Sequence, residues 1–464
     1  MKLLRQILLP AVLFLAVALA GGEMRLVVTT DIHGNLRNLA ALAPEIRKHT
    51  DDRTLIVDLG DTVSGEFPSE YAENSTGMAE ALNILGTALW VPGNHDFAMD
   101  KKDFRDFVRR FKGRALGGDW NFAGVGGEPF VIVERGGIRC AVVALTDTKM
   151  PQRILPGADM TFRDPFAVLD ECMRRIHAAK PHVVVLAWHN GLHSNLGGVR
   201  EVLRRHPGID IVLGGHSHQE IPGMRLGRRT IFVQAGAHAR AAGVVDIRTD
   251  DATGKITGIN SKLIRGDLNS PDAELAALDR RLFLESRGIR FRVLGNHAPP
   301  RPGERNAELG ISGAEALRAA GNADAALLWL GTDDRPRKRT DFTYGDLYRI
   351  LPHRNELCVL TVTRDELSAF IAEHEQLVRK RGYPQQLFAA GIVIHRAGNG
   401  DITRIDAPRK MTLAVNDYLI SDSRVLRPAA FDPKRGFRRL GRLERDVVAD
   451  ALTARRNRNN SSTK

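Results

Sequence analysis

Short apolar runs that end in polar residues recur through the first half of the chain and constrain its fold more than any other feature. Runs such as RLVVTT from Arg25, TLIVDL from Thr54 and ALWVPG from Ala88 are apolar on both faces of a strand, and helical patterns separate them. Strands of this kind lie between two covering layers. We therefore predict an α/β layered fold for this half.

The same alternation of strand and helix continues to about residue 265. Further strand-like runs include a hairpin turning at Gly136 and Gly137, and then HVVVLAWH, IDIVLGG, TIFVQAG and GVVDIRTD. Apolar spacing predicts helices over 36–47, 76–85, 167–179 and 199–205. Because ligand sites in such sheets lie at the carboxyl ends of the strands, polar residues that follow these strands should converge.

Side chains that bind metals follow these strands, in the segments DIHGN, GDT, GNHD, WHNG and GHSH. They supply carboxylate and amide oxygens and imidazole nitrogens, from Asp31, His33, Asp61, Asn94, His189, His216 and His218. Such a set suits divalent transition metals and is large enough for two ions if one carboxylate bridges them. We expect Asp61 to be that bridge. Two such ions would lower the pKa of a shared water and hold the oxygens of a phosphoryl group.

Residues 1–20 have the features of a secretory signal peptide. Lys2 and Arg5 precede an apolar core over 7–19, and Ala18 and Ala20 form a cleavage site before Gly21. The apolar run is short for a bilayer span. Cleavage after Ala20 would release an exported protein, periplasmic or extracellular, with no stable membrane span; an uncleaved anchor is the alternative.

The second half of the chain has a different pattern, which we expect to be α+β. A charged helix over 271–287 is expected to bridge the first domain to a second one. The second domain is expected to contain helices over 312–320, 344–351 and 364–381 and the strands AALLWL, LCVLTVT, GIVIHR and MTLAVNDYLI. The predicted division is a signal peptide over 1–20, a first domain over 21–265, a linker helix over 266–288, a second domain over 289–455 and a basic disordered tail over 456–464.

The ordered metal-ligand segments resemble the calcineurin-like metallophosphoesterase superfamily. The export signal, the two-domain layout, and the stretch TYGDLYRILPHRNEL with TRDEL are similar to the secreted 5′-nucleotidase family. This resemblance implies a layered metallophosphoesterase β-sandwich flanked by helices, then a second α+β domain like the C-terminal domain of the 5′-nucleotidases. It implies that Asp31, His33, Asp61 and His218 hold one divalent ion, and that Asp61, Asn94, His189 and His216 hold the other. Mn, Zn or Fe is expected at each position.

The resemblance also assigns His95 a catalytic role. It corresponds to the imidazole that faces the phosphoryl group, where it stabilises the transition state or protonates the leaving oxygen. The family pairs this imidazole with an aspartate three residues later, and here that residue is Ala98. Asp96 or Asp100 is the candidate replacement, and we include Asp96 in the catalytic set. His238 is a candidate contact for phosphate or for groups behind the metals.

Positions that recognise the nucleotide in the family differ in this chain. The family has a glycine-rich stretch that ends in an arginine, and here the corresponding segment is LWLGTDDRPRKR. Only Gly331 and Arg335 match it, so Arg335 is a candidate substrate residue. A second family arginine is replaced by Val393. An aromatic that stacks on the base is missing after Ser421 and Asp422. Phosphate chemistry is therefore better supported than nucleotide specificity.

The charge and cysteine content exclude some other classes of protein. The formal net charge is +12, and the residues from Arg404 onward hold 15 Lys or Arg against 7 Asp or Glu. Aromatics are not regularly interleaved with these cations, which favours a solvated face over a specific nucleic-acid site. Three cysteines, Cys140, Cys172 and Cys358, are too few and too dispersed for a disulfide scaffold.

We therefore expect a secreted dimetal phosphohydrolase that acts on phosphomonoesters, with 5′-nucleotides among the candidates, by attack of a metal-activated water. Its partner is a phosphorylated small molecule. One alternative is a phosphodiesterase acting on cyclic or sugar nucleotides or lipid headgroups. An alternative from another class is an exported scaffold without turnover that binds anions or nucleic acid.

Overall fold

The computed structural model describes residues 21–63, 76–192, 198–295, 307–331, 341–382, 385–398 and 402–461. The expected signal peptide and Arg335 lie outside these ranges. Within them, no helix combines the length and the apolar character that a membrane crossing needs.

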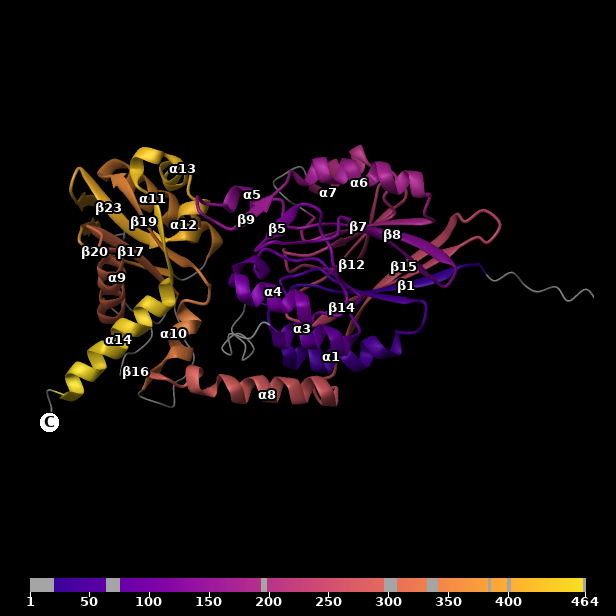
Figure 1. The fold of residues 1–464 in the computed structure, drawn as a ribbon, viewed down its shortest axis with the longest axis horizontal. Helices are drawn as coiled ribbons and strands as arrows, with labels where there is room; N and C mark the ends of the chain where they lie inside the picture. Colours follow the sequence, from indigo (N-terminus) through magenta and orange to yellow (C-terminus); the bar gives the residue numbers. More distant parts are fainter. Residues whose placement is uncertain are drawn as a thin grey trace, which may run out of the picture.

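Two six-stranded sheets face each other in the first lobe, which lies at the right of Figure 1. In spatial order, the first sheet consists of β15 (Ile256–Arg265), β14 (Ala241–Thr249), β1 (Glu23–Thr29), β2 (Thr54–Asp58), β3 (Leu89–Trp90) and β4 (Arg114–Ala115). The second consists of β12 (Glu220–Leu226), β13 (Thr230–Ala235), β11 (Ile211–Gly214), β10 (Val183–Trp188), β8 (Ile138–Leu145) and β7 (Phe130–Arg135). Buried side chains from both sheets, such as Val28 and Val185, form one core between them.

Helices cover the outer face of each sheet. The apolar sides of α1 (Leu36–Lys48), α3 (Thr76–Leu85) and α4 (Lys101–Arg110) pack on the first sheet. Those of α6 (Pro165–Ala179) and α7 (Gly198–Arg205) pack on the second. The four layers confirm the predicted β-sandwich flanked by helices.

The strand directions determine where the polar loops gather. Strands β1, β2, β3 and β4 run parallel, and so do β8, β10, β11 and β13. The loops that follow parallel strands share one edge of their sheet. The predicted ligand segments follow five of these strands, so both sheets deliver them to one end of the sandwich.

The second lobe, at the left of Figure 1, is an α+β unit, as expected. Its sheet has the order β20 (Gln385–Ala390), β17 (Ala325–Gly331), β23 (Lys410–Asn416), β19 (Glu356–Thr363) and β24 (Arg438–Leu443). One face packs against α9 (Ala307–Gly321), α10 (Tyr344–Ile350) and α14 (Glu444–Ser461). The other packs against α11 (Arg364–Arg381), α12 (Asp417–Asp422) and α13 (Leu426–Phe431). Capping boxes at Thr343 and Thr363 begin α10 and α11.

The remaining short elements lie outside these main sheets. They are β5 (Trp120–Phe122), β6 (Val125–Gly126), β9 (Met160–Phe162), η1 (Asp96–Ala98), α5 (Met150–Arg153), β16 (Val293–Gly295), β18 (Phe342–Thr343), β21 (Val393–Arg396), β22 (Ile402–Asp406) and η2 (Pro433–Arg435).

Two local expectations were wrong. The strand predicted through MTLAVNDYLI ends at Asn416, whose side chain accepts a hydrogen bond from the Leu419 amide and thereby caps α12. The tail expected to be disordered from residue 456 is helical as far as Ser461, because α14 continues beyond its buried residues Val448 and Leu452.

Helix α8 (Ala273–Arg290) leads from the first lobe toward the second and runs below the first lobe in Figure 1. Its N-cap is Asp272, whose side chain accepts a hydrogen bond from the Leu275 amide. Leu275, Leu278 and Leu282 join the core beneath α1 and α3. The helix thus matches the predicted bridge, shifted by two or three residues, while the domain boundaries remain predictions.

Candidate metal centre

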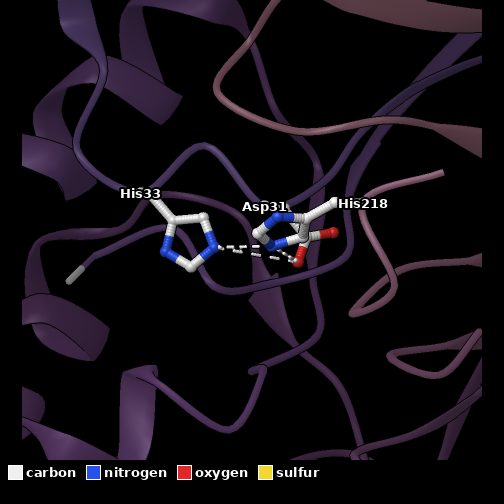
Figure 2. Close-up of side chains that lie close together, drawn as sticks. All are labelled: Asp31, His33 and His218. Atoms are coloured by element: carbon white, nitrogen blue, oxygen red, sulfur yellow. Dashed lines mark hydrogen bonds and ion pairs between the residues drawn. The ribbon is translucent and has the colours of Figure 1, made fainter. Parts of the chain in front are cut away.

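A first cluster of candidate ligands consists of Asp31, His33 and His218, whose ligand atoms all lie within 4.8 Å of one another (Figure 2). The Nε2 atom of His218 is 3.1 Å from Nε2 of His33 and 3.4 Å from Oδ1 of Asp31. Asp31 is fully buried and accepts hydrogen bonds from the Thr30 hydroxyl and the His216 amide. Two imidazoles and a fixed carboxylate therefore converge on one point.

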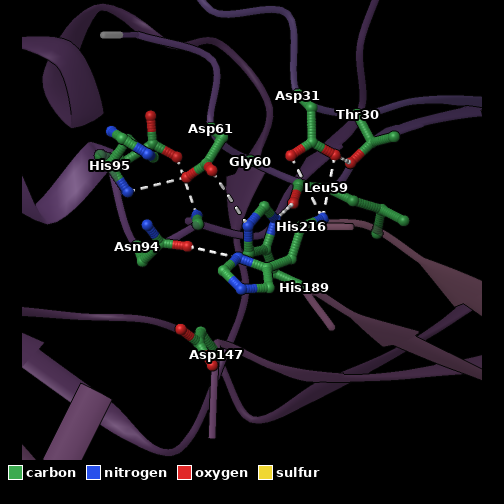
Figure 3. A network of polar contacts seen from close by, with 12 residues as sticks. Thr30, Asp31, Leu59, Gly60, Asp61, Asn94, His95, Asp147, His189 and His216 are labelled. Atoms are coloured by element: carbon green, nitrogen blue, oxygen red, sulfur yellow. Dashed lines mark hydrogen bonds and ion pairs between the residues drawn. The ribbon is translucent and has the colours of Figure 1, made fainter. Parts of the chain in front are cut away.

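A second cluster consists of Asp61, His189 and His216, and Asn94 joins it (Figure 3). Oδ2 of Asp61 lies 3.3 Å from Nε2 of His189. The amide oxygen of Asn94 lies 2.7 Å from Nδ1 of His216. All four residues predicted for the second ion are thus brought together.

Asp61 lies between the two clusters. Its Oδ2 atom, which faces His189, is also 3.9 Å from Nε2 of His33 in the first cluster. Its Oδ1 atom accepts a hydrogen bond of 2.7 Å from the His95 amide. This is the position that a bridging carboxylate requires.

The backbone of these loops adopts a sparsely populated conformation. Five of the predicted ligands have positive φ angles of 47° to 68°: Asp31, His33, Asp61, His216 and His218. Such angles are uncommon outside glycine and persist only where surrounding contacts hold them. Here the Gly60 carbonyl accepts from the Asp31 amide, and the Asp61 carbonyl accepts from the His33 amide, both at 2.8 Å.

Close packing at the site also explains Gly93 in the GNHD segment. A Cβ atom there would lie 2.2 Å from Oδ1 of Asp61 and 2.6 Å from Cε1 of His189. Both distances are shorter than van der Waals contact, so another side chain would displace two candidate ligands.

The chemistry of His189 fits a bound cation. Nδ1 of its ring lies against the Leu59 carbonyl oxygen and must carry a proton to donate to it. Nε2 is buried, has no hydrogen-bond partner among the described residues, and faces the Asp61 carboxylate. In a neutral ring this nitrogen presents a lone pair to the carboxylate, which is favourable only with a cation between them.

Protonation is the other way to satisfy this pair. Burial lowers the pKa of His189, but the charges and contacts of Asp61 and Asp31 outweigh burial and raise it to about 10. Burial raises the pKa of Asp61, and the neighbouring imidazoles bring it well below its ordinary value. The pocket therefore strongly favours positive charge beside Asp61.

His95 lies at the edge of both clusters. Its ring centroid is 5.1 Å from that of His33 and 5.9 Å from that of His353, which belongs to the second lobe. Burial, with the neighbouring imidazoles, lowers the pKa of His95 to about 3 against the opposing charge of Asp61. The ring is therefore neutral near pH 7 and lies where the two lobes meet.

The carboxylate of Asp96 contacts backbone amides. Its Oδ1 accepts from the amides of Thr62 and Val63, and its Oδ2 accepts from Gly93. Burial and the charge of Asp61 raise its pKa, while these amides oppose the shift. Asp96 therefore ties the loop after β2 to the loop after β3, which points to a positioning role. Asp100 caps α4 through the Asp103 amide.

His238 lies beside the first cluster, in agreement with its predicted location. Its ring centroid is 5.3 Å from that of His33 and 5.6 Å from that of His218, and its amide donates to the Asp31 carbonyl. Burial and the charges of His33 and His218 lower its pKa to about 4. The other candidate substrate residue, Arg335, is outside the described residues.

The sequence analysis missed several residues that support this site. Thr146 donates from its hydroxyl to the Pro92 carbonyl and accepts from the Trp188 indole, so it joins the strands that deliver Asn94 and His189. Asp58 holds the turn after β2 through the Gly60 amide and the Thr62 hydroxyl. Asp147, after β8, also lies beside the second cluster (Figure 3).

Comparison with known proteins agrees with this fold. Residues 24–220 match the family model of the calcineurin-like phosphoesterases. The first lobe is thus similar to the metallophosphoesterases, and the curated relatives and solved structures that resemble the chain include 5′-nucleotidases.

Individual relatives share limited identity with the chain. Endonuclease YhcR of Bacillus subtilis is 24% identical over 366 residues, covering 73% of this chain and 30% of that protein. The 5′-nucleotidase of Mus musculus is 23% identical over 270 residues, covering 53% and 46%. The chain thus spans less than half the length of these curated relatives. A candidate 5′-nucleotidase of Staphylococcus aureus superposes with a TM-score of 0.74 at 18% identity, covering 93% of this chain and 97% of that one, which shows a shared fold.

Proposed function

We propose that this protein is a metal-dependent phosphohydrolase that cleaves phosphomonoesters, with 5′-nucleotides among its candidate substrates. The observation that carries the proposal is the pair of His and Asp clusters that meet at Asp61. Similarity to proteins named as an endonuclease and a 5′-nucleotidase supports the phosphate-ester class.

The residues of the two clusters have distinct roles in this proposal. Asp31, His33 and His218 would hold one divalent ion, and Asn94, His189 and His216 the other, with Asp61 between them. When bound, two such ions would lower the pKa of a water molecule and neutralise the phosphoryl oxygens. Mn, Zn and Fe all suit this mixture of imidazole and carboxylate.

His95, as a neutral imidazole, would donate a hydrogen bond to the phosphoryl group or to the leaving oxygen and stabilise the charge that develops there. Its amide already donates to Asp61, so its backbone position is tied to the candidate bridge. Asp96 keeps this loop in place by accepting three backbone hydrogen bonds.

Export to the periplasm or to the extracellular space is part of the proposal. It is supported by the charged start, apolar core and A-x-A site of residues 1–20. Amino-terminal sequencing of protein recovered from outside the cytoplasm should begin at Gly21.

A phosphodiesterase is the second candidate, because similarity to the endonuclease covers 73% of the chain. Mn-replete protein should be assayed on nucleoside 5′-monophosphates, an aryl phosphate, cyclic nucleotides and bis-aryl phosphate. The proposal predicts faster turnover of the monoesters. Faster turnover of the diesters would favour the second candidate, and no turnover of any ester would refute both.

A further inference from the structure

Asp147 is a buried carboxylate outside the predicted ligand set. It follows β8, the neighbour of the strand that delivers His189, and is 1% exposed. Its Oδ1 accepts a hydrogen bond of 3.0 Å from the Lys149 amide. Its Oδ2 has no hydrogen-bond partner among the described residues and lies 3.4 Å from Nη1 of Arg153. Because a buried carboxylate needs an opposite charge, the guanidinium is held beside it.

This ion pair lies next to the second cluster, because Asp147 is placed beside it and Arg153 contacts Asp147. Figure 3 shows Asp147 on the side of the cluster where Asn94 and His216 lie. The Arg153 side chain is 24% exposed, whereas that of Asp147 is 1% exposed, so solvent reaches the arginine and not the carboxylate.

The short helix that carries Arg153 is attached to both lobes. Met150 at its start belongs to the core beneath α1, α3 and α4. Leu155, two residues beyond Arg153, is 2% exposed and belongs to the core of the second lobe with Trp329 and Phe370. Arg153 is therefore fixed at the junction of the lobes, beside the second cluster.

We propose that Arg153 binds a phosphoryl oxygen of the substrate at the second cluster, and that Asp147 positions its guanidinium. The ligand class is the phosphate ester anion, so this inference rests on the proposed function. A guanidinium suits the role because it stays charged and offers several donors in a rigid plane. Asp147 neutralises part of that charge, which favours release of the product.

The test is calorimetric titration of inorganic phosphate into the Mn-replete protein, which needs no turnover. Arg153→Ala should weaken phosphate binding by roughly tenfold or more, as expected for loss of a charge-assisted hydrogen bond. The phosphate affinity of Arg153→Lys should lie between those of the wild type and Arg153→Ala, because lysine keeps the charge and loses the planar donors. The matched control is Arg163→Ala, which removes the same charge from a guanidinium paired with Glu171 on the surface.

Metal content and circular dichroism are measured on every variant, and Arg153→Gln replaces the alanine variant if that one does not fold. Equal phosphate affinity in the wild type and in the folded Arg153 variant, at equal metal content, would overturn the inference. An equal loss of phosphate affinity in Arg163→Ala would overturn it too, because the change in net charge of the protein would then explain the effect. Phosphate binding that depends on Arg153 without turnover of any ester would support this inference while refuting the proposed function.

Discussion

The Nε2 atom of His189 faces the Oδ2 atom of Asp61 across 3.3 Å in a fully buried part of the site. The opposite nitrogen of the ring lies against a backbone carbonyl, so the ring can direct only a lone pair or a second proton at the carboxylate. A divalent ion between the two residues satisfies both. This relationship is the physical basis for the metal-dependent function proposed above.

Asp61→Asn should remove the bridge between the clusters. Because the carboxylate faces donors of both clusters, we expect loss of bound metal and a fall in turnover of at least about a hundredfold. Metal content by mass spectrometry and turnover of an aryl phosphate would be measured on the same sample. Asp246→Asn is the control, since Asp246 pairs with Arg25 far from the site and should keep both properties. Full metal content in Asp61→Asn would contradict the assignment.

His95→Asn should separate catalysis from metal binding. His95 is outside both clusters, so the variant should keep its metal content. Loss of the hydrogen bond that this imidazole donates to the developing charge should slow turnover by about a hundredfold or more. Single-turnover kinetics with metal analysis would check this. A variant that turns over at the wild-type rate would show that His95 has no catalytic role.

Asp96→Asn should reduce stability and turnover together. An asparagine cannot accept all three backbone hydrogen bonds, and an unsatisfied buried amide costs about 1–3 kcal/mol. The displaced loops should lower turnover by roughly tenfold or more. Urea unfolding and the turnover number give the two readouts.

Asp100→Asn is the matched comparison for Asp96. Asp100 caps α4 and its side chain is 55% exposed, and asparagine caps helices about as well as aspartate. We expect little change in either readout. A larger loss of turnover in Asp100→Asn than in Asp96→Asn would assign the orientation of His95 to Asp100 instead.

Glu444 should make the second lobe less stable as the pH rises. Burial raises its pKa from 4.5 to about 8, against a hydrogen bond from Asn416 and with the charge of Asp417. Between these values the folded protein binds one proton more than the unfolded chain, so the free energy of unfolding falls with increasing pH.

Glu444→Gln stays neutral and should lose less stability between pH 5 and pH 8 than the wild type. Urea unfolding at the two pH values checks this, with Glu315→Gln, at an exposed ion pair with Arg318, as control. An equal loss of stability in the wild type and Glu444→Gln would contradict the shifted pKa.

The fold of the first lobe and the convergence of its candidate ligands could be predicted because both depend on local patterns. The buried strands are continuous apolar runs in the sequence, and each candidate ligand segment follows one of them, as His189 follows Val183–Trp188. Asp147 carries the same signal after β8 and could have been found by the same rule. How the donors would divide between two ions is an expectation that comes from the resemblance alone.

Contacts with backbone groups distant in the chain could not be predicted. Asp96 accepts from amides more than thirty residues away, and these contacts leave no side-chain pattern. The strand predicted through Leu419 failed because an apolar run after a polar cap suits a short helix equally well. The proximity of His353 to His95 depends on the packing of two lobes, which local sequence does not specify.

The most direct test of the central claim is metal removal and return, with metal content and aryl phosphate turnover measured on the same samples. Chelation should abolish turnover. Added Mn should restore it as the content approaches two ions per chain, and Asp61→Asn should not recover. Turnover that persists in the metal-free protein, or metal-replete wild-type protein that cleaves no phosphate ester, would contradict the account.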